Sequence, residues 1–244
     1  MGQKQRIDQQ PAWVLHTMPW RETSLIVEVF SRDHGRLALA AKGARRPLSA
    51  LRGVLMAFQP LLMDWSGGGE VKTLVRAEWQ GGQPLLGGRA LLCGYYLNEL
   101  LVRLAAREDP HPALFAAYGE AIAALGRNEA LVVVLRRFEL LLLQELGYGL
   151  DLGHEADSGE PVQERADYVF IIERGPVPLG EIDPASIDGL TIVSGRTLLD
   201  LAARDFSRAE TLAQAKQLLR MLINHYLGGQ PLQSRRVLKE LQEL

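Results

Sequence analysis

The sequence is poor in cysteine, with Cys93 the only one among 244 residues. A single cysteine excludes an internal disulfide framework and is typical of proteins from a reducing compartment. Structural zinc sites use closely spaced cysteine or histidine pairs, so we predict no metal. Charged residues interrupt every apolar stretch before the roughly 20 residues that a membrane span requires. The polar N-terminus lacks the apolar core of a secretory signal, and these absences together predict a cytoplasmic protein.

The sequence also lacks the common catalytic and nucleotide-binding motifs. It has no P-loop, no G-x-G-x-x-G after a strand, no H-E-x-x-H and no G-x-S-x-G. We therefore predict a protein without enzymatic activity or cofactor. A hydrolase that uses the carboxylates of the loop HEADSGE, residues 154–160, is an alternative, which requires those carboxylates to be paired in a pocket.

Acidic residues are absent from one basic stretch, AAKGARRPLSALRG at residues 40–53. The first 80 residues carry eleven Lys and Arg against seven Asp and Glu, and the remainder carries sixteen against twenty-two. This asymmetry suggests that the N-terminal part faces phosphates, although a solvated loop would have the same composition. The predicted phosphate contacts are Lys42, Arg45, Arg46 and Arg52, helped by Arg21 and Lys72. Trp20 and Trp65 flank this surface in the prediction, either as base-stacking residues or as core.

The first 80 residues show the pattern of short strands separated by turns. We predict strands at 13–18, 25–30, 36–41, 61–65 and 71–79, with a helix at 47–58 that starts near Pro47. Three strands, a helix and two strands are the element order of an OB-fold, a five-stranded barrel that binds strands of nucleic acid. The loops and the face of strands two and three are where that fold binds them.

The composition changes at GGQP, residues 81–84, which predicts a domain boundary. We expect residues 1–81 to form the barrel and residues 82–244 a helical domain, with a small irregular and β insertion at about 151–195 that contains a short strand at 168–172. The fold class is therefore α+β. Arg136 and Arg137 interrupt an apolar helical stripe. They are either structural ion pairs or the charged part of a site for an acidic, partly apolar peptide.

Several separate blocks resemble the RecO family of bacterial recombination and repair proteins. In chain order these blocks are VLHTMPWRETSLIVEVFSRDHGRLALAAKGARR, FQPLLMDWSGGGEVKTLVRAE, YYLNELLVRL, LRRFELLLLQELGYGLDL, SGEPV and YLGGQPLQSR. The likeness extends from about Ala12 to Arg236, nearly the whole chain. It implies an N-terminal OB-fold and a helical C-terminal domain.

The resemblance also implies a recombination mediator without a chemical step. Such a protein binds single- and double-stranded DNA, anneals complementary strands, and engages RecR and the acidic C-terminal tail of single-stranded DNA-binding protein. It thereby helps to load RecA, and it works near the nucleoid. Some relatives hold zinc in a four-cysteine cluster, but the corresponding region here, from residue 150 to about 182, has no cysteine. The alternative function is a protein-interaction scaffold whose barrel binds peptide.

Overall fold

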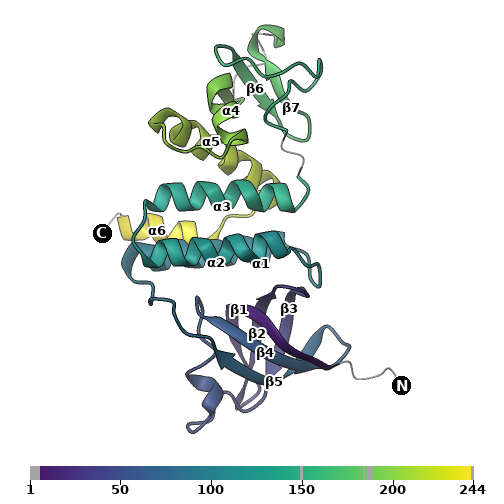
Figure 1. Ribbon diagram of the computed structural model, residues 1–244, viewed down its shortest axis with the longest axis vertical. Coiled ribbons are helices and arrows are strands. Elements are labelled where there is room, and N and C mark those ends of the chain that lie inside the picture. Colours follow the sequence, from purple (N-terminus) through teal and green to yellow (C-terminus); the bar gives the residue numbers. More distant parts are fainter. Residues whose placement is uncertain (1–5, 149–150, 184, 186–188, 243–244) are drawn as a thin grey trace. The chain divides into compact units, whose positions relative to one another are not determined.

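The computed structural model describes residues 6–148, 151–183, 185 and 189–242 (Figure 1). These residues belong to two units. The first comprises the chain up to Glu129 together with the residues from Leu232 onward, and the second runs from Ala130 to Pro231.

Five strands of the first unit form a closed barrel in the order β1-β2-β3-β5-β4. They are β1 (Arg6–Trp20), β2 (Ser24–Ser31), β3 (Gly35–Ala41), β4 (Pro60–Ser66) and β5 (Val71–Trp79). All neighbouring pairs are antiparallel except β3 and β5, whose parallel pairing closes the barrel together with the β1–β4 pair. The predicted five-stranded, OB-like barrel is confirmed, and β1 extends at both ends beyond the predicted residues 13–18.

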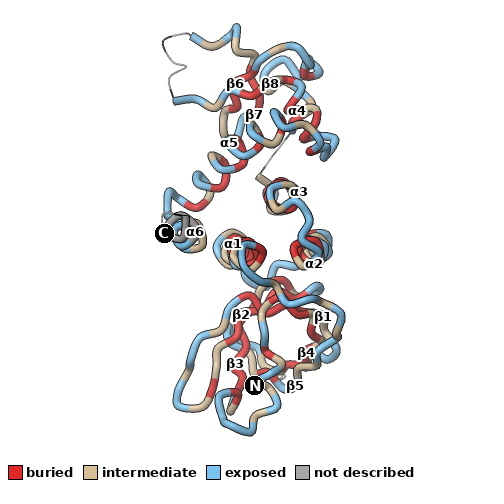
Figure 2. Tube along the Cα trace, turned by 90° about the vertical axis from the view of Figure 1, so that its left-hand side faces the viewer, coloured by how far each residue is buried: buried red, intermediate tan, exposed pale blue. Residues whose placement is uncertain are grey.

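Alternation of side chains along these strands fills the barrel with apolar residues. Val27 and Val29 of β2 and Leu37 and Leu39 of β3 are at most 1% exposed and belong to one core cluster. Both strands are mostly buried along their length (Figure 2). Trp65 on β4 lies in the same cluster and is 1% exposed.

The helix predicted at residues 47–58 is wrong. Only a short 3₁₀ helix, η1 (Ala50–Arg52), forms there, and none of its residues is buried. The preceding backbone makes successive i to i+3 turns, in which Arg46 N–H donates to the Gly43 carbonyl and Ser49 N–H to the Arg46 carbonyl. Leu48, one of the residues at helical spacing, is fully exposed. Leu51 and Leu55 pack against the barrel core, but with Leu48 in solvent the remaining apolar stripe is too short to stabilise a longer helix.

Three helices complete the first unit: α1 (Gly88–Leu104), α2 (Pro112–Gly126) and α6 (Gln233–Gln242). A buried polar chain joins α1 and α2 to the barrel, since Tyr118 donates to Asn98 Oδ1 at 2.6 Å and Asn98 Nδ2 donates to the Leu15 carbonyl at 2.9 Å. Burial raises the pKa of Tyr118. Its ring also packs edge-on against Trp13, with centroids 5.4 Å apart, so α2 covers one outer face of the barrel.

The carboxylate of Glu99 on α1 anchors the start of α6. It accepts hydrogen bonds from the backbone N–H groups of Gln233 and Ser234, each at 2.8 Å, and from the Ser234 hydroxyl at 2.6 Å. Burial alone would raise the pKa of Glu99, but these hydrogen bonds and the charge of Arg103 outweigh burial and lower it. The ionised carboxylate is thus the form that holds the helix N-terminus.

The second unit combines three helices with a small sheet. It contains α3 (Leu131–Glu145), β6 (Asp167–Ile171), β7 (Gly175–Pro178), the short η2 (Leu179–Glu181), β8 (Ile192–Ser194), α4 (Gly195–Ala202) and α5 (Ala209–Tyr226). The sheet has the order β7-β6-β8, with both pairs antiparallel. The predicted strand at 168–172 is confirmed as β6, and among the described residues the insertion also contains β7 and β8, which complete a three-stranded sheet.

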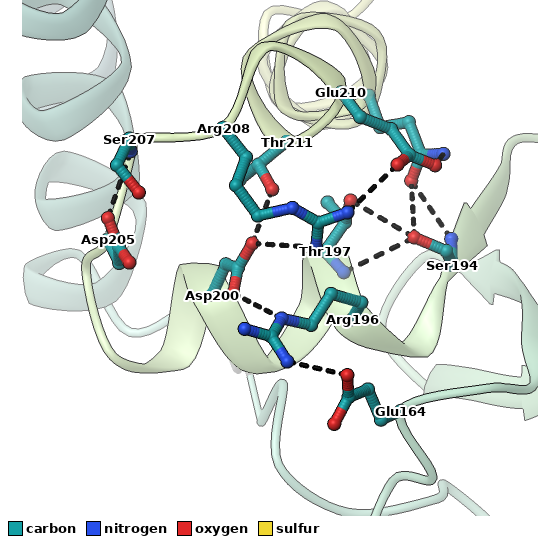
Figure 3. A network of polar contacts seen from close by, with 11 residues as sticks. Glu164, Ser194, Arg196, Thr197, Asp200, Asp205, Ser207, Arg208, Glu210 and Thr211 are labelled. Carbon is teal, nitrogen blue, oxygen red and sulfur yellow. Dashed lines mark hydrogen bonds and ion pairs between the residues drawn. The ribbon is translucent and has the colours of Figure 1, made fainter.

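A polar network around Asp200 fixes α4 against α5 (Figure 3). Asp200 is 6% exposed and accepts hydrogen bonds from Thr211 Oγ1 at 2.5 Å and Arg196 Nε at 3.1 Å. Arg196 also reaches Glu164 in the loop before β6. The N–H of Thr197 donates to Ser194 Oγ at 3.3 Å, which caps α4. The network thus uses its carboxylates to join neighbouring elements.

Candidate nucleic-acid interface

The basic loop after β3 lies against the hairpin loop that joins β1 to β2. The N–H of Arg45 donates to the Thr23 carbonyl at 2.9 Å, and the N–H of Gly43 lies 3.4 Å from Ser24 Oγ. Gly43 has a φ of 72°, a left-handed conformation that glycine adopts without strain. This turn places the basic loop next to the loop that joins β1 to β2.

Arg45 contributes directly to the joint between the two loops. Its Nη1 donates to the backbone carbonyls of Glu22, at 3.2 Å, and Arg21, at 3.4 Å. Arg21 is also left-handed, with a φ of 53°, and its guanidinium carbon lies 4.2 Å from the centroid of the Trp20 ring. A non-glycine residue in this conformation costs about 1 kcal/mol or more and is held there by its surroundings.

Four predicted phosphate contacts therefore gather at one end of the barrel, a group that we call the basic rim: Arg21, Lys42, Arg45 and Arg46. All four are exposed. None of them forms an ion pair with another residue in the part of the chain that the structure describes. Glu22 is the one acidic residue of the adjoining hairpin loop. The basic rim is thus a surface of positive charge that is open to solvent.

Arg52 and Lys72 are placed differently from the basic rim. Arg52 is exposed on η1, outside the loop itself. The side chain of Lys72 is only 13% exposed, forms an ion pair with Glu108 and lies 3.4 Å from the Gly69 carbonyl. Its charge is therefore already compensated within the protein.

Trp65 does not take part in any surface. Because it is 1% exposed inside the barrel, it cannot stack on a base, and the core reading of the two offered by the sequence is correct. Trp20, by contrast, is half-buried next to Arg21.

The two arginines of α3 differ in burial: Arg136 is buried and Arg137 is exposed. Arg136 is 7% exposed and forms an ion pair with the fully buried Glu139 at 2.7 Å. Of the two alternatives that the sequence left open for Arg136, this is the structural ion pair. Arg137 is exposed. The pKa of Asp205 is lowered mainly by hydrogen bonds from Ser207, with a smaller effect of the Arg137 charge. A peptide site on this helix could therefore use Arg137 but not the buried charge of Arg136.

Two of the carboxylates of the loop at 154–160 are engaged in structural contacts. Glu155 accepts hydrogen bonds from Ser158 at 2.7 Å and Tyr168 at 3.0 Å, and Asp157 pairs with Arg174. No cluster of three or more His, Cys, Asp and Glu side chains suited to a metal occurs among the described residues. The described helices include none that is long and apolar enough to cross a membrane. The contacts within this loop do not resemble a paired catalytic dyad.

Sequence reasoning missed two kinds of contact at this interface. The hydrogen bonds between the β1–β2 loop and the basic loop join residues more than twenty positions apart, and the partner of Lys72 lies 36 positions away. No local pattern reveals such pairs. Two sequence signals pointed to the basic rim: the basic stretch without acidic residues at 40–53 and the excess of positive charge in the first 80 residues.

Comparisons with known proteins cover nearly the whole chain. Residues 6–82 match the family model described as "Recombination protein O N terminal", and residues 87–236 match "Recombination protein O C terminal". Three similar curated proteins carry the name "DNA repair protein RecO". They come from Aromatoleum aromaticum (75% identical), Azoarcus sp. strain BH72 (73%) and Dechloromonas aromatica (55%), and each match covers 100% of both chains. The chain therefore belongs to the RecO family of DNA repair proteins.

Proposed function

We propose that this protein binds single- and double-stranded DNA through the basic rim and anneals complementary strands without a chemical step. The observation that supports the proposal is the gathering of four exposed cations, without ion-pair partners among the described residues, at one end of an OB-like barrel. Cations of this kind track phosphates and do not read bases. Two strands held on one basic surface repel each other less and meet at a higher local concentration, which favours pairing.

We further propose that residues 1–81 are the DNA-binding domain and residues 82–244 the domain that meets protein partners. Membership of the RecO family supports RecR and the acidic C-terminal tail of single-stranded DNA-binding protein as partners, with RecA loading at the nucleoid as the outcome. Arg137 is the exposed cation of α3 that suits an acidic tail. Charge reversal in the variant Arg137→Glu should weaken tail-peptide binding in a fluorescence anisotropy titration, and unchanged binding would remove Arg137 from this role.

Salt dependence tests the DNA-binding proposal. If the basic rim neutralises about four phosphates of a single strand, the logarithm of affinity falls with the logarithm of salt concentration with a slope of about −3. The double variant Lys42→Ala/Arg46→Ala removes two contacts and should reduce the slope to about −1.5. Neither side chain makes a hydrogen bond within the described part of the protein, so the loop should keep its shape.

A matched control removes the same charge elsewhere. Arg76 and Arg127 are exposed arginines, each in an ion pair with a nearby glutamate. The double variant Arg76→Ala/Arg127→Ala should leave the slope near its original value. Equal slopes in the rim variant and the wild-type protein would contradict the proposal, and binding without salt dependence would favour the peptide-binding scaffold instead.

A further inference from the structure

An apolar strip runs along the outward face of β1 and β2 toward the basic rim. Val27 points into the barrel core, so the preceding residue on β2, Ile26, points outward. In the β1–β2 register, Met18 lies opposite Ile26, and Trp20 lies opposite Ser24. Met18 is 46% exposed, and Trp20 and Ile26 are half-buried. We call Trp20, Met18 and Ile26 the apolar strip.

The Trp20 end of the strip is held in place by the basic rim. Arg21 covers the Trp20 ring at 4.2 Å, and the Arg21 carbonyl accepts from Arg45. Ser24, the cross-strand partner of Trp20, is buried, and its hydroxyl oxygen faces the Gly43 N–H. The indole is therefore presented from a loop that is fixed at several points, which lowers the ordering cost of binding a ligand there.

The carboxylate on the same face of the sheet is neutralised. Glu28, opposite His16 in the register, is 6% exposed and forms ion pairs with Arg36 and Arg107. A polyanion that follows the strip away from the basic rim thus meets apolar surface and a compensated carboxylate.

We propose that the apolar strip is a stacking site for an unpaired base, with Trp20 as its platform. This inference rests on the proposed DNA binding. A base that stacks on the indole displaces the Arg21 guanidinium from the ring, and the freed cation can then contact the adjacent phosphate. In a duplex the faces of the bases are already stacked on the neighbouring base pairs, so a duplex gains only the phosphate contacts of the basic rim. Trp20 therefore gives the rim a preference for single strands over duplex.

Trp79 provides a matched control. It is 59% exposed, more than Trp20, but its Nε1 donates to Gln59 at 2.9 Å, and the nearby arginine on β5, Arg76, is paired with Glu78. Exposure alone would make Trp79 the better platform. The proposal instead requires an indole beside unpaired cations and so favours Trp20. The remaining tryptophans, Trp13 and Trp65, are at most 5% exposed.

The test measures binding of a dT20 oligonucleotide and of a 20-base-pair duplex at one fixed salt concentration. The variant Trp20→Leu should bind dT20 about 10-fold more weakly and the duplex within about twofold of wild type. Its salt slope should stay unchanged, because the phosphate contacts remain. Trp20→Phe should recover most of the affinity for dT20, and Trp79→Leu should change neither ligand. Circular dichroism checks the folding of each variant.

Fluorescence gives an independent readout. In a Trp79→Phe background, dT20 should quench the tryptophan emission, and the further change Trp20→Phe should abolish the quenching. The stacking inference is overturned if Trp20→Leu weakens both ligands equally or neither, or if quenching survives without Trp20. If the wild-type protein binds neither ligand, the proposed function itself fails, which is a distinct result.

Discussion

Glu28 holds the β2–β3 hairpin to the segment after α1, and its replacement should destabilise the first unit. The carboxylate is 6% exposed and pairs with Arg36, whose side chain is 13% exposed, and with Arg107, whose side chain is 46% exposed. Arg36 Nε also donates to the Ala105 carbonyl at 3.0 Å. The variant Glu28→Gln leaves a largely buried guanidinium without a counter-charge. Removal of one partner from a fully buried pair costs about 3–5 kcal/mol, and the exposure of Arg107 reduces this to about 2–4 kcal/mol.

The assay is urea unfolding followed by tryptophan emission, since Trp13 and Trp65 are both buried in the first unit. With a denaturant slope of about 2 kcal/mol per molar urea, the midpoint should fall by about 1–2 M. The control Glu22→Gln removes an exposed carboxylate from the loop between β1 and β2 and should change the midpoint little.

A double-mutant cycle isolates the pair. The double variant Glu28→Gln/Arg36→Met should lose less free energy of unfolding than the sum of the two single variants, by about 1 kcal/mol or more. The reason is that the buried guanidinium of Arg36, which the single change Glu28→Gln leaves unpaired, is no longer present. A loss below about 0.5 kcal/mol for Glu28→Gln, or simple additivity in the cycle, would refute the reasoning.

Two further predictions concern the first unit. Because the folded pKa of Glu99 is lowered, its contribution to stability is full above the unfolded value of about 4.3 and is lost as the pH falls through the folded pKa. Glu99→Gln should therefore reduce the urea midpoint at pH 7 and differ less from wild type near pH 3, and a constant difference would contradict this. Gly35 has a φ of 62°, and an added Cβ would lie 2.1 Å from the Asp109 carbonyl oxygen. Gly35→Ala should cost more than about 2 kcal/mol in thermal unfolding, whereas Gly43→Ala, with its nearest neighbour at 3.5 Å, should cost about 1 kcal/mol. Equal losses would show that steric crowding at Gly35 is unimportant.

The strands of the barrel could be predicted because their periodicity is local. The β-rich runs at 25–30 and 36–41 became β2 and β3 almost residue for residue. The prediction of a helix at 47–58 was wrong because Leu48 has the spacing of a buried helix face but no surface to pack against. The strands β7 and β8 were missed because they span only four and three residues, too few for a period to be visible.

The candidate interface was predictable in its residue types but not in its partners. A run of basic residues without acidic ones can be recognised from sequence alone, and it led to Lys42, Arg45 and Arg46. Which cations are compensated depends on residues distant in sequence. Glu108 forms an ion pair with Lys72, and Glu139 forms one with the buried Arg136 on the same helix, α3. The carbonyls that hold Arg45 are backbone groups and carry no sequence signal.

The return of α6 to the first unit has a consequence for the order in which the chain folds. On the ribosome, the barrel, α1 and α2 are made before the second unit, whereas α6 is made only after it. Domains generally fold as units during synthesis. The hydrogen bonds from Gln233 and Ser234 to the Glu99 carboxylate, however, can form only after Ala130–Pro231 has been translated. The contact of α6 with α1 therefore serves as a late completion step. A premature stop in the second unit would yield a barrel that can form its own core but lacks this last contact.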